Sequence, residues 1–179
     1  MEISVTQYGK PLSKDKYTWN EETKTFTSEE CDLVLDFYGI DGVTFNTSTD
    51  CTFKTGHNCT FDTGSWCTFN TGSYCTFDTG SGCTFDTGSH CAFKTGSSCN
   101  FKTGHNCTFD TDPECVIVRR DVFEVIQVPK NTTIKLNDYQ VKGYEIIKDT
   151  KTKTITIDGK EIEISIESFE SLKEQLLEN

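Results

Sequence analysis

The sequence is short of basic residues and has no long apolar run. Its 179 residues include 17 Lys and Arg against 28 Asp and Glu, which gives a formal net charge of -11. Sequence-independent binding to nucleic acid or to an anionic membrane needs a basic face, so we expect no nucleic acid and no membrane as partner. No stretch is apolar enough to span a bilayer, and residues 1–12 lack the apolar core of a signal peptide. We therefore expect synthesis in the cytoplasm.

Signatures of catalysis are missing too. The chain has three His, and it contains no Ser-His-Asp arrangement, no glycine-rich phosphate loop, no C-x-x-C pair and no metal-binding helix motif. Asp62 and Asp78 are expected to stack as neighbours, an arrangement that can attract Ca²⁺, but two solvated carboxylates are the simpler interpretation. We predict a protein that is not an enzyme and that holds no cofactor and no metal.

An eight-residue repeat, C-T-F-x-T-G-x-x, dominates the middle of the chain. Thr fills the fifth place of every unit from Thr47 to Thr111, and Gly fills the sixth place from Gly56 to Gly104. The first place holds Val43 and then Cys51, Cys59, Cys67, Cys75, Cys83, Cys91, Cys99, Cys107 and Cys115. The third place holds Phe45 and then Phe53, Phe61, Phe69, Phe77, Phe85, Phe93, Phe101 and Phe109. Leu35-Asp36-Phe37 is interpreted as one more degenerate copy.

The spacing within the unit predicts a strand with two different faces. The first, third and fifth residues project to one face of an extended chain, and the second and fourth to the other. Since Phe and free Cys are commonly buried, whereas fourth-place residues such as Lys54 and Asp62 need water, the Cys-Phe-Thr face is predicted to lie inside. The sixth-place Gly is predicted to adopt a positive φ and so to turn the chain.

Short strands with one apolar face have to coil and stack, so we predict a mainly β protein, a parallel β-solenoid. Two octads per coil, wound right-handed, is the favoured arrangement, and three octads in a triangular section is the alternative. Cys residues on opposite sheets are then too far apart for disulfides, and stacked Cys point the same way. The nine cysteines are expected to form a ladder of buried reduced thiols beside the Phe ladder.

The repeat is expected to need a cap at each end, which divides the chain into 1–42, 43–115, 116–150 and 151–179. In the N-terminal cap, Lys16–Trp19 and Lys24–Thr27 are predicted to form a β-hairpin leading to a strand at Leu33–Phe37. After the repeat, the β-rich segments are predicted to be terminal coils: Val116–Val118, Val122–Val128 and Ile134–Leu136.

The last part of the chain has a different pattern. Lys153–Ile157 and Glu161–Ser165 flank Asp158-Gly159, which predicts a second β-hairpin. Beyond Ser165, apolar residues at helical spacing predict a short amphipathic helix that ends near Glu178. Packing of this helix on its own hairpin is favoured over a role as an oligomerisation element.

The stretch from Cys59–Trp66 to Cys83–His90 resembles octapeptide-repeat proteins found in phage, giant-virus and environmental sequences. The resemblance covers about 43–115, and the Arg119-Arg120-Asp121 stretch after the repeat fits the same setting. It implies the solenoid fold and association with a virion. It brings no defined biochemical activity.

The variable eighth place of the octad is the best source of contact residues. Trp66 and Tyr74 are predicted to stand exposed on opposite corners, where they suit sugar stacking or protein contact; shielding of the sheet edges is the equally weighted alternative. His57, His90 and His105 occupy the seventh or eighth place, at solvent-facing turns, and His57 and His105 lie too far apart to share a metal.

We therefore expect a non-enzymatic structural or adhesive protein, associated with a phage or virus, that presents a rigid solenoid to a protein or a host glycan and that forms a homo-oligomer. One alternative is ice binding through the outward Thr rows, which the charged fourth-place residues and interruptions at Ala92 and Asn100 disfavour. The other is an acidic DNA mimic, disfavoured because residues 51–112 carry few net charges.

Overall fold

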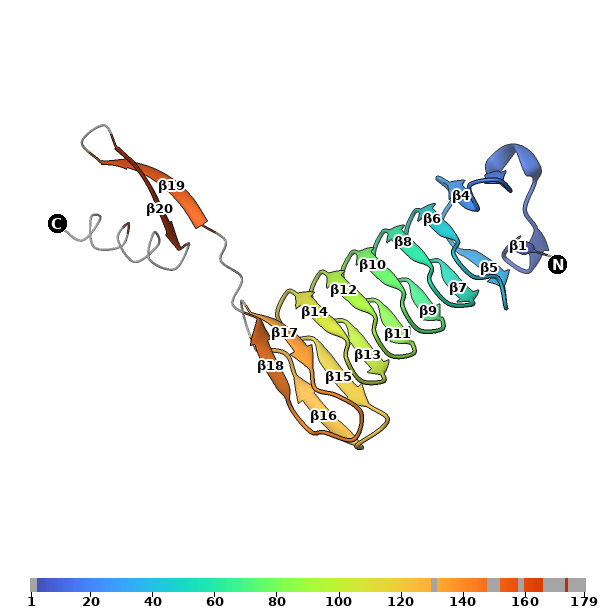
Figure 1. The fold of residues 1–179 in the computed structure, drawn as a ribbon. Helices are drawn as coiled ribbons and strands as arrows, with labels where there is room; N and C mark the ends of the chain where they lie inside the picture. Colours follow the sequence, from blue (N-terminus) through green and yellow to red (C-terminus); the bar gives the residue numbers. More distant parts are fainter. Residues whose placement is uncertain (1–2, 130–131, 148–151, 158–159, 166–172, 174–179) are drawn as a thin grey trace. The chain divides into compact units, whose positions relative to one another are not determined.

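The structure, a computed structural model, describes residues 3–129, 132–147, 152–157, 160–165 and 173 (Figure 1). The chain divides into two compact units, Met1–Ile147 and Lys148–Asn179. Strands account for nearly all of the regular structure in the described residues, with one 3-10 turn at Lys14–Lys16. In this part of the chain, no helix has the length and apolar character needed to cross a membrane.

The first unit consists of two sheets of nine strands each, which face each other across the core. The first sheet contains β1 (Ser4–Gln7), β2 (Lys10–Pro11), β5 (Leu33–Phe37), β7 (Thr52–Thr55), β9 (Thr68–Asn70), β11 (Thr84–Asp86), β13 (Asn100–Thr103), β15 (Val116–Arg119) and β16 (Glu124–Gln127). The second contains β3 (Thr18–Asn20), β4 (Thr25–Ser28), β6 (Thr44–Thr47), β8 (Thr60–Thr63), β10 (Thr76–Thr79), β12 (Ala92–Thr95), β14 (Thr108–Thr111), β17 (Thr133–Leu136) and β18 (Tyr144–Ile147).

The strand register confirms a parallel β-solenoid with two octads per coil. Phe77 in β10 lies opposite Phe61 in β8 on one side and Phe93 in β12 on the other, and the strands run parallel. Successive octads therefore alternate between the two sheets. In a coil of three octads, each Phe would instead have paired with the Phe three octads further along the chain.

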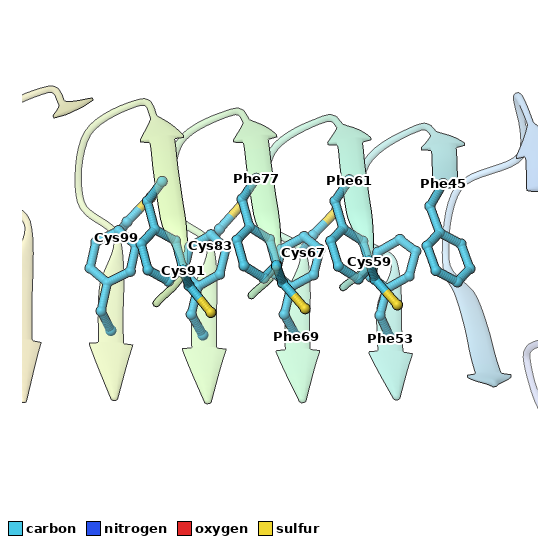
Figure 2. Close-up of a cluster of buried hydrophobic side chains, with 14 of the residues drawn as sticks. Phe45, Phe53, Cys59, Phe61, Cys67, Phe69, Phe77, Cys83, Cys91 and Cys99 are labelled. Carbon is cyan, nitrogen blue, oxygen red and sulfur yellow. The ribbon is translucent and has the colours of Figure 1, made fainter. Parts of the chain in front are cut away.

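The phenylalanines form the predicted ladder inside the solenoid (Figure 2). Within one sheet the rings stack: Phe61 and Phe77 have centroids 4.8 Å apart and planes 3° apart. Across the core the rings meet edge to face, as Phe61 and Phe69 do at 5.1 Å and 76°. Both geometries are favourable for aromatic quadrupoles, so each ring is stabilised by neighbours along the ladder and across it.

The cysteine ladder is confirmed as well. All ten cysteines are free thiols, and the nine in the repeat are buried. Each sulfur from Cys59 onward lies near a carbonyl of the preceding coil; the Cys83 thiol, for example, donates to the Gly64 carbonyl at 3.7 Å. The thiol thus acts as a small apolar side chain that also satisfies a backbone acceptor.

The parallel stack begins before the repeat, in the region predicted to be a cap. The predicted hairpin is present, because β3 pairs antiparallel with β4, and β4 then joins β6 in parallel. The predicted phase of Leu35-Asp36-Phe37 is wrong: Leu35 lies opposite Phe53, and Phe37 opposite Thr55. Phe37 fits the Thr place because its ring fills the end of the core, 5.1 Å from the ring of Phe45.

At the other end the chain reverses. β15 is the last parallel strand, with Ile117 opposite Phe101 in the Phe place. The prediction of terminal coils beyond it is wrong, since β16 runs antiparallel to β15, β17 antiparallel to β14, and β18 antiparallel to β17. The reversal follows the turn before β16, where Phe123 has φ 51°. Antiparallel strands can be joined by tight turns, so they close both sheets with little chain.

The second unit contains the predicted hairpin. β19 (Thr152–Ile157) pairs antiparallel with β20 (Lys160–Ser165), with Ile155 opposite Ile162. The helix predicted after Ser165 lies outside the described residues, apart from Lys173.

Candidate functional site

The turns between strands form two parallel edges of the solenoid, and these edges carry the side chains singled out from the sequence. Turns that lead from the second sheet to the first form one edge, with Trp66 in the turn between β8 and β9. We call it the tryptophan edge; its eighth-place residues are Asp50, Trp66, Gly82, Ser98 and Glu114. Turns in the opposite direction form the histidine edge, with Asn58, Tyr74, His90 and Asn106 in the eighth place and His57 and His105 in the seventh.

The eighth residue, and not the sixth-place glycine, is the one that turns the chain. Trp66, Tyr74 and His90 have φ of 62°, 63° and 60°, and their counterparts in the other coils have similar values. The sixth-place glycines have no positive φ, so the predicted glycine bend is wrong. Because the left-handed conformation recurs whatever the side chain, the stack of coils holds it in place.

The sixth-place glycine is needed for a different reason, namely close contact with the coil before it. A Cβ atom at Gly88 would lie 2.1 Å from Ser73 Oγ and 2.8 Å from the Ser73 amide nitrogen. The same hydroxyl accepts a hydrogen bond from the amide of Ser89, 3.1 Å away, and Ser65 and Ser81 repeat the pattern on the other edge. Glycine in the sixth place therefore makes room for a column of hydroxyls that link successive coils.

Four aromatic rings run along the histidine edge. Tyr74 and His90 stack with centroids 4.9 Å apart and planes 6° apart. His90 meets His105 edge to face at 5.2 Å, and His105 meets Tyr139 at 5.4 Å. Tyr74 and Tyr139 are 59% and 60% exposed, so the two ends of this column are open to solvent, while the ring contacts cover its interior.

His57 lies on the same edge but is separate from this column. Its Nδ1 accepts a hydrogen bond from the amide of Ser73 at 2.9 Å, the place taken by a serine hydroxyl in neighbouring coils. That contact places the proton of the neutral imidazole on Nε2. His57 is therefore fixed by the backbone, away from His90 and His105.

Trp66 on the tryptophan edge has a different environment. The next coil has Gly82 in the same position, and the benzo ring of the indole occupies the space that a side chain there would fill, since a Cβ at Gly82 would lie 2.5 Å from Trp66 Cε3. Trp66 remains 65% exposed. Trp66 and Tyr74 thus lie on opposite edges, and only Trp66 lies against bare backbone.

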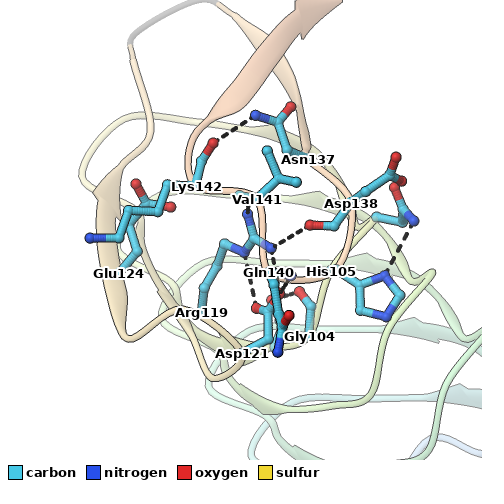
Figure 3. Close-up of polar contacts among 12 residues, drawn as sticks. Gly104, His105, Arg119, Asp121, Glu124, Asn137, Asp138, Gln140, Val141 and Lys142 are labelled. Carbon is cyan, nitrogen blue, oxygen red and sulfur yellow. Dashed lines mark hydrogen bonds and ion pairs between the residues drawn. The ribbon is translucent and has the colours of Figure 1, made fainter.

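Sequence reasoning missed Arg119, which takes the buried fifth place in the last parallel strand. Its side chain is fully buried (Figure 3). The guanidinium donates to both carboxylate oxygens of Asp121, at 3.2 and 2.7 Å, and to the carbonyls of Asp138, Val141 and Gly143. An Arg in a place otherwise held by Thr was the signal available in the sequence.

This buried ion pair holds the loop that carries Tyr139. Asp121 also accepts a hydrogen bond from the amide of Gln140, at 3.1 Å. Burial alone would raise the pKa of the Asp121 carboxyl, but the hydrogen bonds and charge of Arg119 and the Gln140 amide outweigh it and hold that pKa below its usual value. The Arg119–Asp121 pair therefore fixes the end of the histidine edge.

The outward faces of both sheets are flat and carry ion pairs between coils. Lys94 Nζ lies 2.7 Å from Asp78 and Lys102 Nζ lies 3.2 Å from Asp86. Second-place threonines lie side by side in register, such as Thr60 beside Thr76. These ion pairs and threonine rows make the described outward faces polar.

Within the described residues, no group of three or more His, Cys, Asp and Glu is close enough together to hold a metal ion. Comparison with known proteins finds no matching family model, no matching curated protein and no matching solved structure.

Proposed function

We propose that the protein is a non-enzymatic adhesive protein of a phage or virus particle, in which a rigid solenoid displays contact residues along its two edges. The observation that carries the proposal is the turn geometry. Eighth-place residues as different as Trp66, Gly82 and Ser98 share a φ between 59° and 70°, while the Cys and Phe rows beneath them hardly vary. Side chains at the turns can therefore change without changing the backbone that presents them.

Several features support a role in binding. The exposed large hydrophobic side chains on the edges include Trp66 and Tyr74, and rigid aromatic residues contribute disproportionately to contact energies. Because each turn is hydrogen-bonded to the next coil, as the Trp66 amide is to the Ser81 carbonyl at 3.0 Å, little backbone freedom is lost when a partner binds. The viral setting rests on the likeness of the octad to repeats in phage and giant-virus sequences.

The proposal is tested with a variant in which the edges are stripped of their rings. Trp66→Ser, Tyr74→Ser and His90→Ser together place serine where Ser98 already adopts the same φ, so the fold is retained. We expect the full chain to bind either glycans on a microarray or virions made from the genome that encodes it, and the stripped variant to lose that binding. Failure of the full chain to bind either, or equal binding by the stripped variant, would refute the proposal.

Ice binding is the second candidate, because the register places exposed threonines in rows, with Thr52 beside Thr68 on the first sheet. Ion pairs such as Lys94–Asp78 stand beside the corresponding row of the second sheet and disturb a regular hydroxyl lattice. A thermal-hysteresis measurement on the full chain decides the question, since an ice-binding face produces hysteresis at micromolar protein. The same ion pairs neutralise acidic residues and so disfavour a DNA mimic.

A further inference from the structure

We infer that Trp66, lying against Gly82 on the tryptophan edge, is the platform of a binding site for neutral hexopyranose oligosaccharides. This inference rests on the proposed adhesive function and names the site and the ligand class. The indole packs where the next coil has no side chain. Its benzo ring fills the space beside Gly82, where a Cβ would lie 2.5 Å from Cε3 and 2.7 Å from Cζ3.

The arrangement leaves an aromatic face free. One side of the indole contacts the Gly82 backbone, and the residue is still 65% exposed, so the opposite side faces solvent. Tyr74 on the other edge is also covered on the side toward the next coil, but there the neighbour is the parallel ring of His90 at 4.9 Å and not bare backbone. Trp66 is thus an eighth-place ring that lies against backbone and not against another ring.

Polar eighth-place residues of successive coils lie in a row on both sides of Trp66 and Gly82. Successive eighth-place residues are separated by about 4.8 Å along the axis, the spacing of neighbouring strands. Asp50 lies one coil before Trp66, and beyond Gly82 come Ser98 and Glu114, which are themselves hydrogen-bonded at 3.2 Å. Asp50, one coil away, can accept a hydrogen bond from a sugar stacked on the indole, and Ser98 and Glu114, two and three coils beyond Trp66, can bond further units of an oligosaccharide.

This chemistry selects the ligand class. The C–H groups on one face of a hexopyranose are weakly positive and apolar, which suits the negative face of an indole. Asp50 and Glu114 accept hydrogen bonds from sugar hydroxyls, whereas they repel the carboxylates and sulfates of acidic sugars. A single exposed ring bounded by polar groups is also a smaller apolar area than stable protein interfaces bury, which favours a glycan over a protein partner.

The test compares variants of the full chain on a glycan microarray, followed by calorimetric titration with the best neutral oligosaccharide. Trp66→Ser removes the platform and should weaken binding by about tenfold or more, the loss typical of truncating a central tryptophan. Gly82→Asn keeps the backbone, since Asn58 has φ 57° in the same place, but displaces the indole, so it should weaken binding too. Asn58→Ser, in the same eighth place with φ 57° but on the opposite edge, is the matched control and should bind as the wild type does.

Each other outcome overturns the inference in a recognisable way. Equal binding of neutral glycans by wild type and Trp66→Ser would move the site elsewhere on the solenoid and leave the adhesive function standing. Binding of acidic glycans alone, or of virions through Trp66 without any glycan, would refute the ligand class and leave the function standing. Absence of binding to glycans and virions alike would refute both. Circular dichroism of Trp66→Ser and Gly82→Asn establishes that each variant is folded.

Discussion

Gly80 packs directly against Ser65 of the preceding coil: a Cβ atom at Gly80 would lie 2.2 Å from the serine Oγ, 2.8 Å from its amide nitrogen and 2.9 Å from its Cα. The hydroxyl is also committed, because it accepts the amide of Ser81 at 3.1 Å. Ser65 therefore cannot move aside to admit a Cβ at position 80, because two of its backbone atoms and its bonded hydroxyl would all be too close. Gly80 is therefore required for these two coils to stack.

Gly80→Ala should therefore destabilise the protein by about 1–3 kcal/mol, the usual cost of forcing extra volume into a packed site. Gly104→Ala is the matched control: its Cβ would meet Ser89 Oγ at 2.1 Å, but the next contacts are at 3.2 and 3.3 Å, so a rotation of one hydroxyl relieves it. Since alanine also restricts the unfolded chain, this control should be nearly neutral. Urea unfolding measures the free energy of unfolding of both variants. Equal losses of stability would contradict the explanation that Gly80 is required by its contact with Ser65.

The eighth place gives a complementary prediction about backbone conformation. Asn58 has φ 57°, a region that Asn and Gly tolerate and that β-branched residues avoid. Asn58→Val should lower the free energy of unfolding by about 1–2 kcal/mol, whereas Asn58→Gly should leave it nearly unchanged. Thermal unfolding of the two variants is the measurement, and a stable valine variant would show that the turn can relax.

The octad sequence is enough to predict the strands of the solenoid but not the role of its glycine. Alternation of Cys, Phe and Thr is enough to predict strands, their buried face and the ladders, because side-chain direction follows from a two-residue period. The reason for the glycine is not local. It depends on Ser65 lying beside Gly80, a contact between coils that no single unit contains.

Contacts between coils also decide the structure at the ends and on the edges of the solenoid, and a single octad does not reveal them. Leu35 and Phe37 are apolar and two residues apart, as the octad requires. Only their pairing with Phe53 and Thr55 shows which place of the octad each residue fills. Trp66 is recognisable as an exposed aromatic from its place in the octad, but its position along the edge depends on Gly82 in the next coil. Arg119 is buried because a loop from 138–143 closes over it, which local sequence does not indicate.

The buried thiol ladder should make the stability of the protein fall at alkaline pH. The two neighbouring thiols of Cys67, Cys75 and Cys91 act in opposite directions, one raising and one lowering the pKa, and with burial added the pKa of each rises from 9.0 to about 11. A raised folded-state pKa contributes stability that is complete below the unfolded value and is lost as pH rises toward the folded value. The free energy of unfolding should therefore fall between about pH 9 and pH 11, as urea titrations at each pH would measure.

Valine provides the control for this effect, since Val43 fills the same place in the first unit and is fully buried. A variant with Cys67→Val, Cys75→Val and Cys91→Val removes three of the titrating groups at similar volume. Its stability should decline less steeply over the same pH range. Identical profiles for this variant and the wild type would assign the base sensitivity to lysine or tyrosine instead.

Removing the negative charge beside Arg119 should loosen the C-terminal cap. Asp121→Asn leaves a fully buried guanidinium without its ion pair, a change that costs about 3–5 kcal/mol at such sites. Because Asp121 also holds the amide of Gln140, the loop should move and the contact of Tyr139 with His105 should be lost. NMR shifts of the His105 ring report the contact. Asp112→Asn, at an exposed turn position, should change neither the shifts nor the stability.

Acid should produce the same loosening in the unaltered protein. The pKa of Asp121 is lowered in the folded state, so its contribution to stability is present above the unfolded value of about 3.9 and is lost as pH falls through the folded value. Between about pH 4 and pH 2, the hydrogen-exchange protection of residues 138–143 should fall before that of the central coils, whose Phe and Cys rows carry no carboxyl group. In Asp121→Asn the loop should exchange quickly at every pH, with no further step in acid. Simultaneous exchange of loop and coils in the wild type would instead mean that the cap and the solenoid unfold as one unit.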